Sequence, residues 1–108
     1  PAGQPAAVLI RAIEPLEGLD LIAAYRPGRP RHEWTSGPAR LTKALAIDRA
    51  FNGIDLTSGP LIIAPGVPVP DGEIQNGPRI GIAAAPEPWL SAPYRFWIAG
   101  NPYVSKPR

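Results

Sequence analysis

The sequence predicts a mixed α+β fold, in which a mainly antiparallel β-sheet is flanked by short helices. Three observations support this class. Short apolar runs bounded by turn signals are typical of strands, capped runs with apolar residues three or four apart are typical of helices, and Pro- and Gly-rich stretches connect the two. Apolar residues make up 44% of the 108 residues, which is enough to form the core of one small domain.

The first element is a predicted strand over residues 6–13. Both of its alternating faces are largely apolar, so we expect it to be central in the sheet. Arg11 interrupts this run, and a guanidinium in a half-buried strand is costly unless something pairs with it. Its head could reach out to water, or it could hold a phosphate, a carboxylate or a catalytic water in a site. The apolar neighbours on both sides favour the second interpretation.

Two helices follow. Pro15 suits the first turn of a short helix that reaches about Tyr25. The second helix begins at Ser36-Gly37-Pro38, where Ser36 or Gly37 can cap it and Pro38 fits the first helical position, and it ends near residue 47. Asp48 then caps a short turn that leads to the turn signal Asn52-Gly53.

The remaining strands are predicted at residues 61–64, 79–84 and 94–99. Residues 65–78 contain four prolines and three glycines, so we expect an irregular connection there. The chain from Asn101 onward is predicted to be a terminal extension.

Composition limits the possible functions. The net charge is +2 and the pI is near 9.4, which permits a nucleic-acid partner without requiring one. The absence of cysteine excludes disulfides, thiolate metal sites and a cysteine nucleophile. His32 is the only histidine and makes no metal site by itself, so we expect neither a metal nor a cofactor. No apolar run approaches the roughly 18 residues of a membrane span, and residues 1–8 lack the pattern of a signal peptide.

Two further groups of residues could carry chemistry. The start of the second helix combines Ser36 and Gly37 with Arg40, an arrangement that suits a phosphate but also fits an ordinary capped surface helix. Glu14 and Glu17 could act as a general acid and base, but acids are also favoured at the start of a helix for electrostatic reasons.

Four stretches resemble one family in order and in spacing: VLIRAIEPLEGL, SGPARLTKALAIDRAFNGIDL, PRIGIAAA and PYRFWIAGNPYVS. This family is the alkyladenine (3-methyladenine) DNA glycosylases of the mammalian type, which also occur in bacteria. The resemblance covers residues 8–105. The family domain is roughly twice as long, so residues 1–108 are similar to the C-terminal part of one glycosylase domain. The resemblance therefore implies a curled, open barrel-like sheet in an incomplete domain.

The resemblance also implies roles at the reaction centre. Arg11 matches the family arginine beside the nucleophilic water and the flipped nucleotide, and the backbone carbonyl of Ile80 matches one that holds this water. Glu14 and Glu17 do not match the catalytic glutamate. That general base is expected upstream of this chain, so the chain alone is expected to be inactive.

A second set of matching positions implies contacts with DNA. In the family these positions contact phosphates or let the DNA backbone come close, and here they are Ser36, Gly37, Arg40, Arg49 and Gly81. Ala39 replaces a residue that is often polar in relatives, so one phosphate contact is expected to be lost.

The implied function is base-excision repair. After base flipping, such an enzyme hydrolyses the N-glycosidic bond of alkylated or deaminated purines such as 3-methyladenine and hypoxanthine. The expected partners are double-stranded DNA with a damaged purine and the missing N-terminal half of the domain, with no membrane involved. The alternative is a non-catalytic DNA-binding fragment or module with the same half of the fold. We expect a cytoplasmic, nucleoid-associated protein if the source is bacterial and a nuclear one if it is eukaryotic.

Overall fold

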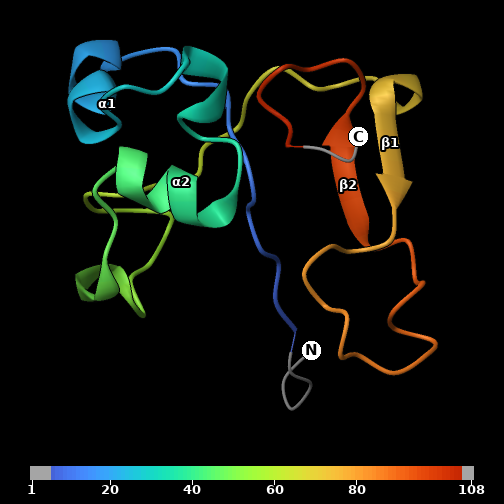
Figure 1. Ribbon diagram of the computed structural model, residues 1–108. Helices are drawn as coiled ribbons and strands as arrows, with labels where there is room; N and C mark the ends of the chain where they lie inside the picture. Colours follow the sequence, from blue (N-terminus) through green and yellow to red (C-terminus); the bar gives the residue numbers. More distant parts are fainter. Residues whose placement is uncertain (1–5, 106–108) are drawn as a thin grey trace.

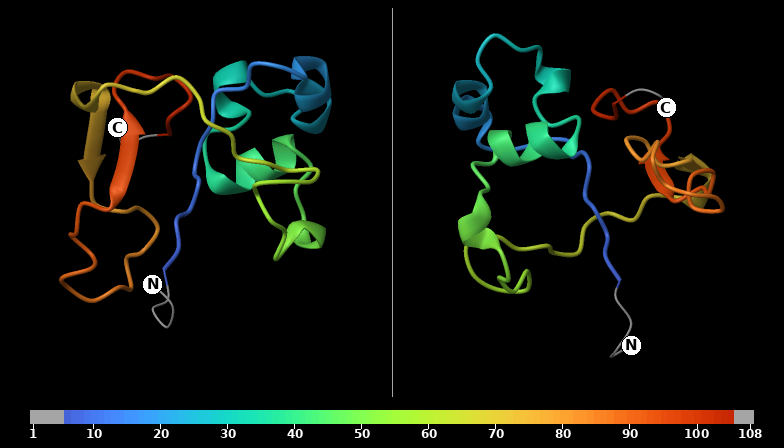
Figure 2. Two further views of the ribbon diagram at one scale, coloured as in Figure 1. Left: turned by 180° about the vertical axis from the view of Figure 1, so that it is seen from behind. Right: turned by 60° about the horizontal axis from the view of Figure 1, so that its bottom comes forward.

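The computed structural model describes residues 6–105 and has two groups of elements (Figure 1). Helices α1 (Leu19–Tyr25) and α2 (Pro38–Ala44) form one group, and strands β1 (Ile74–Gly77) and β2 (Arg95–Ile98) form the other. Residues 6–13 run between the two groups, as both views in Figure 2 also show. The predicted mixed α+β class with an antiparallel sheet is confirmed. Parts of the N-terminal stretch and of the terminal extension, residues 1–5 and 106–108, lie outside the described residues.

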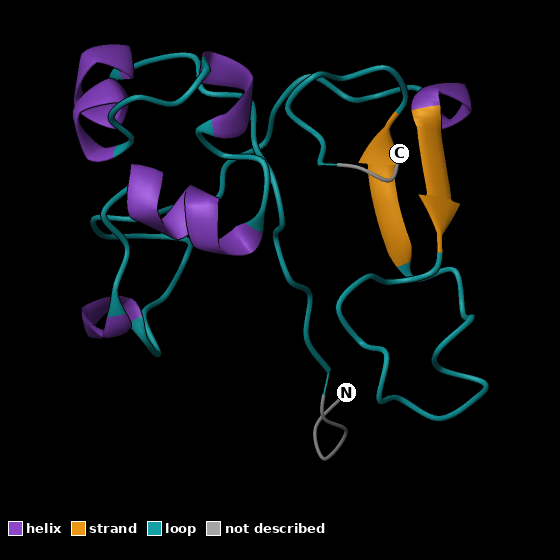
Figure 3. Ribbon diagram, in the orientation of Figure 1, coloured by secondary structure: helices purple, strands orange, loops and turns teal. Residues whose placement is uncertain are grey.

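Short 3₁₀ turns complete the secondary structure: η1 (Arg31–Glu33), η2 (Arg49–Phe51) and η3 (Asp71–Glu73). Most of the chain between these elements is loop (Figure 3). Within residues 6–105, none of the helices has the length and apolar character that a membrane crossing requires.

Local capping explains where the helices begin. Helix α2 starts at Pro38 directly after Gly37, as the sequence predicts, and Asp48 accepts a hydrogen bond from the Ala50 amide at 2.9 Å to cap η2. Helix α1 ends at Tyr25 as expected, but it begins at Leu19 rather than near Pro15. Gly18 adopts φ 66°, a left-handed conformation that prevents the helix from extending toward the N-terminus.

The sheet consists of two strands within the described residues. Strands β1 and β2 pair antiparallel, with Ile74 opposite Ile98 and Gly77 opposite Arg95. Strand β2 confirms the prediction at residues 94–99, whereas β1 lies in the stretch that was expected to be irregular. Two strands alone do not make an open barrel, so the barrel-like sheet stays a prediction.

Three predicted strands are wrong. Residues 6–13 are extended but pair only through an isolated bridge between Ala12 and Ser36, so this segment is not a central strand. Residues 61–64 form a loop, and the Ile63 amide donates a backbone hydrogen bond to the nearby Leu56 carbonyl at 2.8 Å instead of pairing with a strand. Residues 79–84 are interrupted by Gly81 at φ 76°, which bends the chain away from a strand conformation.

The buried apolar core is small. Among the described residues it comprises Ile22, Leu41 and Ala44, which come from helices α1 and α2. The accessible surface of 8329 Å² exceeds the roughly 5800 Å² expected for a compact 11.5 kDa monomer. The radius of gyration of 15.5 Å also exceeds the roughly 13 Å expected for 108 residues. The chain is therefore less compact than a typical monomer of its mass.

Candidate functional site

A groove of about 1050 Å³ lies between the N-terminal segment, strand β2 and the C-terminal segment. We call it the Arg11 groove, and it is lined by residues 7–14, 79, 80, 82, 94–98, 101 and 103–105. Arg11 and Ile80 are both half-buried on its wall. Within residues 6–105, Arg11 has no carboxylate within ion-pair distance. The structure thus brings the two residues predicted for the reaction centre to one cavity.

Arg95 is a residue of this groove that the sequence analysis missed. Its side chain is buried, its Nη2 donates a hydrogen bond to the Ser105 carbonyl at 2.8 Å, and its Cζ lies 4.6 Å from the centre of the Trp97 ring. Burial lowers the pKa of the Arg95 guanidinium from its ordinary value, and the positive charge of Arg11 lowers that pKa further. The signal was the same as for Arg11, because Arg95 also stands inside an apolar strand sequence.

A hydrogen bond joins two residues that line the groove. The Asn101 side-chain amide donates to Glu14 Oε1 at 3.4 Å, which joins the N-terminal segment to the C-terminal segment. Glu14 is therefore a wall residue of the Arg11 groove, and Glu17 is exposed and does not line it. The two acids are not brought together in this groove as a catalytic pair would require.

The predicted phosphate-binding helix start is attached to the segment that carries Arg11. Ala12 bridges to Ser36 in an antiparallel sense, and the Thr35 hydroxyl donates a hydrogen bond to the Ile13 carbonyl at 2.7 Å. Thr35 is fully buried, so water cannot replace this bond. The start of α2 is thereby held beside Arg11.

Arg40 folds back over the start of its own helix. Its Nη1 donates to the Ser36 hydroxyl at 3.0 Å and lies 3.9 Å from Glu33 Oε1. Gly37 precedes the helix with φ 142°, a conformation in which side chains are strained. The three predicted phosphate contacts, Ser36, Gly37 and Arg40, are therefore adjacent in space.

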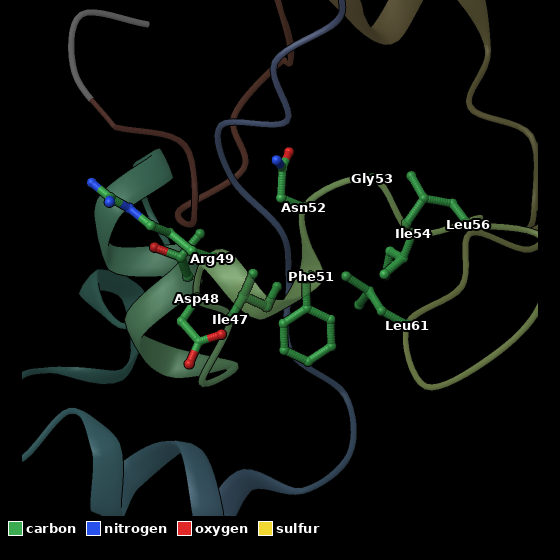
Figure 4. A pocket seen from close by; sticks show the side chains of 10 residues that line it. Ile47, Asp48, Arg49, Phe51, Asn52, Gly53, Ile54, Leu56 and Leu61 are labelled. Carbon is green, nitrogen blue, oxygen red and sulfur yellow. The ribbon is translucent and has the colours of Figure 1, made fainter.

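Arg49 and Gly81 are the two remaining positions predicted to contact DNA. Arg49 is exposed at a shallow, open depression of about 810 Å³, and Figure 4 shows its guanidinium extending away from Phe51 and Leu61. Gly81 is exposed next to Ile80, and nothing stands within 4 Å of the place where a Cβ would be. Both residues are exposed to solvent, so a macromolecule can reach them.

Comparison with known proteins adds independent information. The family model described as Methylpurine-DNA glycosylase (MPG) matches residues 1–102. A protein from Bacillus licheniformis named "Putative 3-methyladenine DNA glycosylase" is 50% identical over 105 residues, which are 97% of this chain and 52% of that protein. Proteins of the same name from Carboxydothermus hydrogenoformans and Bacillus subtilis are 48% and 50% identical, over 96% and 94% of this chain.

The matches cover 53% and 50% of these two relatives, so the chain spans about half the length of the curated relatives it matches. The family match, in contrast, extends over nearly the whole chain and includes Arg11, α2, Ile80 and β2. The chain therefore belongs to the methylpurine-DNA glycosylase family.

Proposed function

We propose that this chain is the C-terminal part of a base-excision repair enzyme that hydrolyses the N-glycosidic bond of alkylated or deaminated purines, such as 3-methyladenine and hypoxanthine. The observation that carries the proposal is that Arg11 and Ile80 face one groove in a chain of the glycosylase family. The substrate is a flipped nucleotide in damaged double-stranded DNA, because the glycosidic bond is inaccessible inside the base stack.

The chemistry requires a water molecule, a base that removes its proton and a group that orients it. The water oxygen attacks C1′ of the deoxyribose, the bond from C1′ to the purine nitrogen breaks, and its electron pair leaves with the purine. In this proposal the Ile80 carbonyl accepts a hydrogen bond from the water. The Arg11 guanidinium lies beside the flipped nucleotide, where its charge stabilises the anionic phosphate.

The start of α2 would hold the DNA backbone beside Arg11 and Ile80. The bridge between Ala12 and Ser36 supports this arrangement, because it keeps Ser36, Gly37 and Arg40 next to the segment that carries Arg11. Exposed Arg49 and the open surface at Gly81 would meet the DNA backbone further along. Such contacts fix the position of the protein on the duplex without reading the sequence.

The general base would come from the other half of the family domain. Of the acids singled out in the sequence, Glu14 is hydrogen-bonded to Asn101 in the groove wall and Glu17 lies outside the groove. The isolated chain is therefore expected to be inactive, and the assembled enzyme would act wherever the chromosome is, in the bacterial cytoplasm or the eukaryotic nucleus.

The test uses the complete protein, with both halves present, and a duplex oligonucleotide that contains one hypoxanthine. We expect Arg11→Ala to lower single-turnover excision by about a hundredfold, because a nucleotide that is no longer held in place loses the alignment of C1′ with the attacking water. Arg29→Ala, which removes an exposed guanidinium outside the groove, is the matched control and should leave excision unchanged. Unchanged excision by Arg11→Ala would contradict the role of Arg11.

The alternative is a non-catalytic DNA-binding module. It is favoured by the basic groups at α2 and at Arg49, which could bind phosphates without any catalysis. Salt-sensitive DNA binding without purine release by the complete protein would support it over the glycosylase proposal. Purine release by the isolated 108-residue chain would contradict an upstream general base.

A further inference from the structure

Arg95 places a second guanidinium in the wall of the Arg11 groove. It lies on β2 and is only 6% exposed, so its charge is largely removed from water. Burial of a charge is costly, and the 2.8 Å bond from its Nη2 goes to a neutral acceptor, the Ser105 carbonyl. This bond satisfies one donor and leaves the positive charge in place. The wall of the groove therefore carries a buried positive charge in addition to that of Arg11.

The surroundings of Arg95 fix the position of this charge. Its Cζ lies 4.6 Å from the centre of the Trp97 ring, whose face attracts a cation. Trp97 is held in turn, because its Nε1 donates to Gln75 Oε1 at 3.0 Å. A Cβ at Gly77, the residue opposite Arg95 in the sheet, would lie a tight 3.3 Å from Trp97 Cη2, so glycine leaves room for the ring. The guanidinium is therefore positioned before any ligand binds.

The charges of the groove favour an anion. In the described part of the chain, its lining contains three arginines and one acid, which are Arg11, Arg79, Arg95 and Glu14. Burial lowers the pKa of Arg95 and the charge of Arg11 lowers it further, so the two guanidiniums repel each other. An anion between them replaces this repulsion with two attractions, and the planar donors of a guanidinium match the oxygens of a phosphate. The groove is therefore suited to a phosphate group.

From these observations we infer that Arg95 is a further substrate-binding residue, whose guanidinium holds one phosphate of the flipped nucleotide together with Arg11. The inference rests on the proposed function, because it takes that nucleotide to be the occupant of the groove. It adds to that function a residue, and a defined group of the substrate that the residue binds.

The burial of Arg95 gives this contact a role in the selection of damaged DNA. Arg49 is exposed, so the phosphates of any duplex can reach it. Arg95 is buried in the groove wall, so a phosphate reaches it only after its nucleotide has left the base stack. The contact therefore stabilises the flipped state alone and shifts the equilibrium toward it. Because a damaged nucleotide leaves the stack more easily, Arg95 increases the preference for a lesion over undamaged DNA.

The test uses the complete protein, with both halves present, and two duplexes that differ at one position. One carries a tetrahydrofuran abasic analogue, which flips easily and has no glycosidic bond to hydrolyse, and the other is undamaged. Fluorescence anisotropy at one fixed salt concentration measures both affinities. Arg95→Gln should weaken binding of the analogue duplex about tenfold, the effect of one lost bond to a charged group, and should change binding of the undamaged duplex less than about twofold.

Two further variants separate the charge of Arg95 from its packing. Arg95→Lys retains the charge without the planar donors and should weaken binding of the analogue duplex less than about threefold. Arg26→Gln is the matched control, because Arg26 is also buried, at 9% exposure, and its Nη2 also donates to a backbone carbonyl, that of Glu33, at 3.4 Å. Arg26 lies outside the groove, so this variant should leave the ratio of the two affinities unchanged.

A second measurement needs neither DNA nor a substitution. Inorganic phosphate added to the complete protein should shift the NMR signal of the Trp97 indole, because the Arg95 guanidinium lies over this ring. The indoles of Trp34 and Trp89 are internal controls, since neither residue lines the groove. Sodium chloride at equal ionic strength corrects for screening.

Three outcomes would overturn the inference. They are equal losses of affinity for both duplexes in Arg95→Gln, no loss for the analogue duplex in this variant, and a Trp97 indole signal that phosphate does not move. A shifted indole signal combined with unchanged DNA affinity in Arg95→Gln would assign the groove to a free phosphate instead of a DNA phosphate. The phosphate titration uses the unsubstituted protein, so it decides the matter even if a variant fails to fold.

The inference and the proposed function fail in different ways. If Arg95→Gln weakens binding of the analogue duplex as expected but the complete protein releases no purine, the phosphate contact stands and the glycosylase proposal fails. If the complete protein releases purine and Arg95→Gln leaves the affinity for the analogue duplex unchanged, the glycosylase proposal stands and the role of Arg95 fails.

Discussion

The Thr35 hydroxyl donates a 2.7 Å hydrogen bond to the carbonyl of Ile13, and this bond attaches the start of helix α2 to the segment that carries Arg11. Thr35 is fully buried and Ile13 is half-buried, so removal of the hydroxyl leaves the Ile13 carbonyl without its partner in a poorly solvated place. Together with the bridge between Ala12 and Ser36, this bond couples the two parts of the proposed DNA-binding site.

Thr35→Val should lower the free energy of unfolding by about 1–3 kcal/mol, because it keeps the shape of the side chain and removes the hydroxyl. Urea unfolding of the assembled protein, followed by tryptophan fluorescence, measures this change. Thr42→Val is the control, because the Thr42 hydroxyl only bonds back to carbonyls of its own helix and its loss should be nearly neutral. Equal effects of both substitutions would show that the bond to Ile13 has no special role.

Gly37→Ala should destabilise the protein by about 1–3 kcal/mol, because alanine is strained at φ 142°. The destabilisation comes from backbone strain and not from a steric clash, because a Cβ at Gly37 would lie 3.9 Å from its nearest atom, Arg40 Cδ, which is an ordinary van der Waals contact. Gly72→Ala, at a position without such a φ or any close neighbour, should change stability by less than about 0.5 kcal/mol. Urea midpoints of the two variants compare them directly.

Arg95→Ala should loosen the C-terminal wall of the Arg11 groove. The substitution removes the hydrogen bond to the Ser105 carbonyl and the stack on Trp97, and bonds from charged groups contribute about 1.5–3 kcal/mol. Hydrogen exchange in residues 101–105 should accelerate. Arg29→Ala, which removes an exposed guanidinium, should leave exchange there unchanged, and a similar acceleration in both variants would contradict the role of Arg95.

Arg40→Ala and Arg49→Ala should each reduce the slope of log affinity for DNA against log salt by about 1, the value for one lost phosphate contact. A fluorescence-anisotropy titration of a duplex at several salt concentrations measures this slope. Lys43→Ala is the control, because Lys43 is an exposed cation of α2 outside the proposed contacts. A slope that neither arginine affects would exclude this surface from the DNA interface.

Thr57→Val should raise the pKa of Asp55. Hydrogen bonds from the Thr57 hydroxyl and then from the Thr57 amide hold this pKa below its ordinary value of 3.8. Because the folded-state pKa is depressed, the associated stability is present above pH 3.8 and is lost as the pH falls through the lower folded value. An NMR titration of the Asp55 carboxyl should show the midpoint moving toward 3.8 in the variant, and an unmoved midpoint would contradict the assignment.

Features set by neighbouring residues could be predicted from the sequence. Helix α2 and turn η2 begin where Gly37-Pro38 and Asp48 place them, because caps act within one helical turn. Arg11 could also be singled out, because a charge in an apolar run needs a partner or a cavity, and it does line a groove. Its role beside a nucleotide stays a prediction.

Features that depend on distant partners could not be predicted. Strand β1 is formed by the largely polar sequence Ile-Gln-Asn-Gly, and its strand conformation comes from pairing with β2 about twenty residues later. Residues 6–13 have the composition of a strand, but only Ala12 finds a bridge partner within the described part of the chain. Arg95 could have been singled out like Arg11, as a charge in an apolar run, but its burial could not, because the burial comes from the C-terminal segment packing onto it.

The bond between Asn101 and Glu14 has a consequence for the order of folding. It joins residues 87 positions apart, and the groove as a whole brings residues 7–14 together with residues 79–105. The entropy of closing so long a loop must be overcome before these contacts form, whereas α2 closes its hydrogen bonds locally. The groove is therefore expected to be the slowest part of the molecule to assemble, which leaves its apolar walls exposed to association for longest after synthesis.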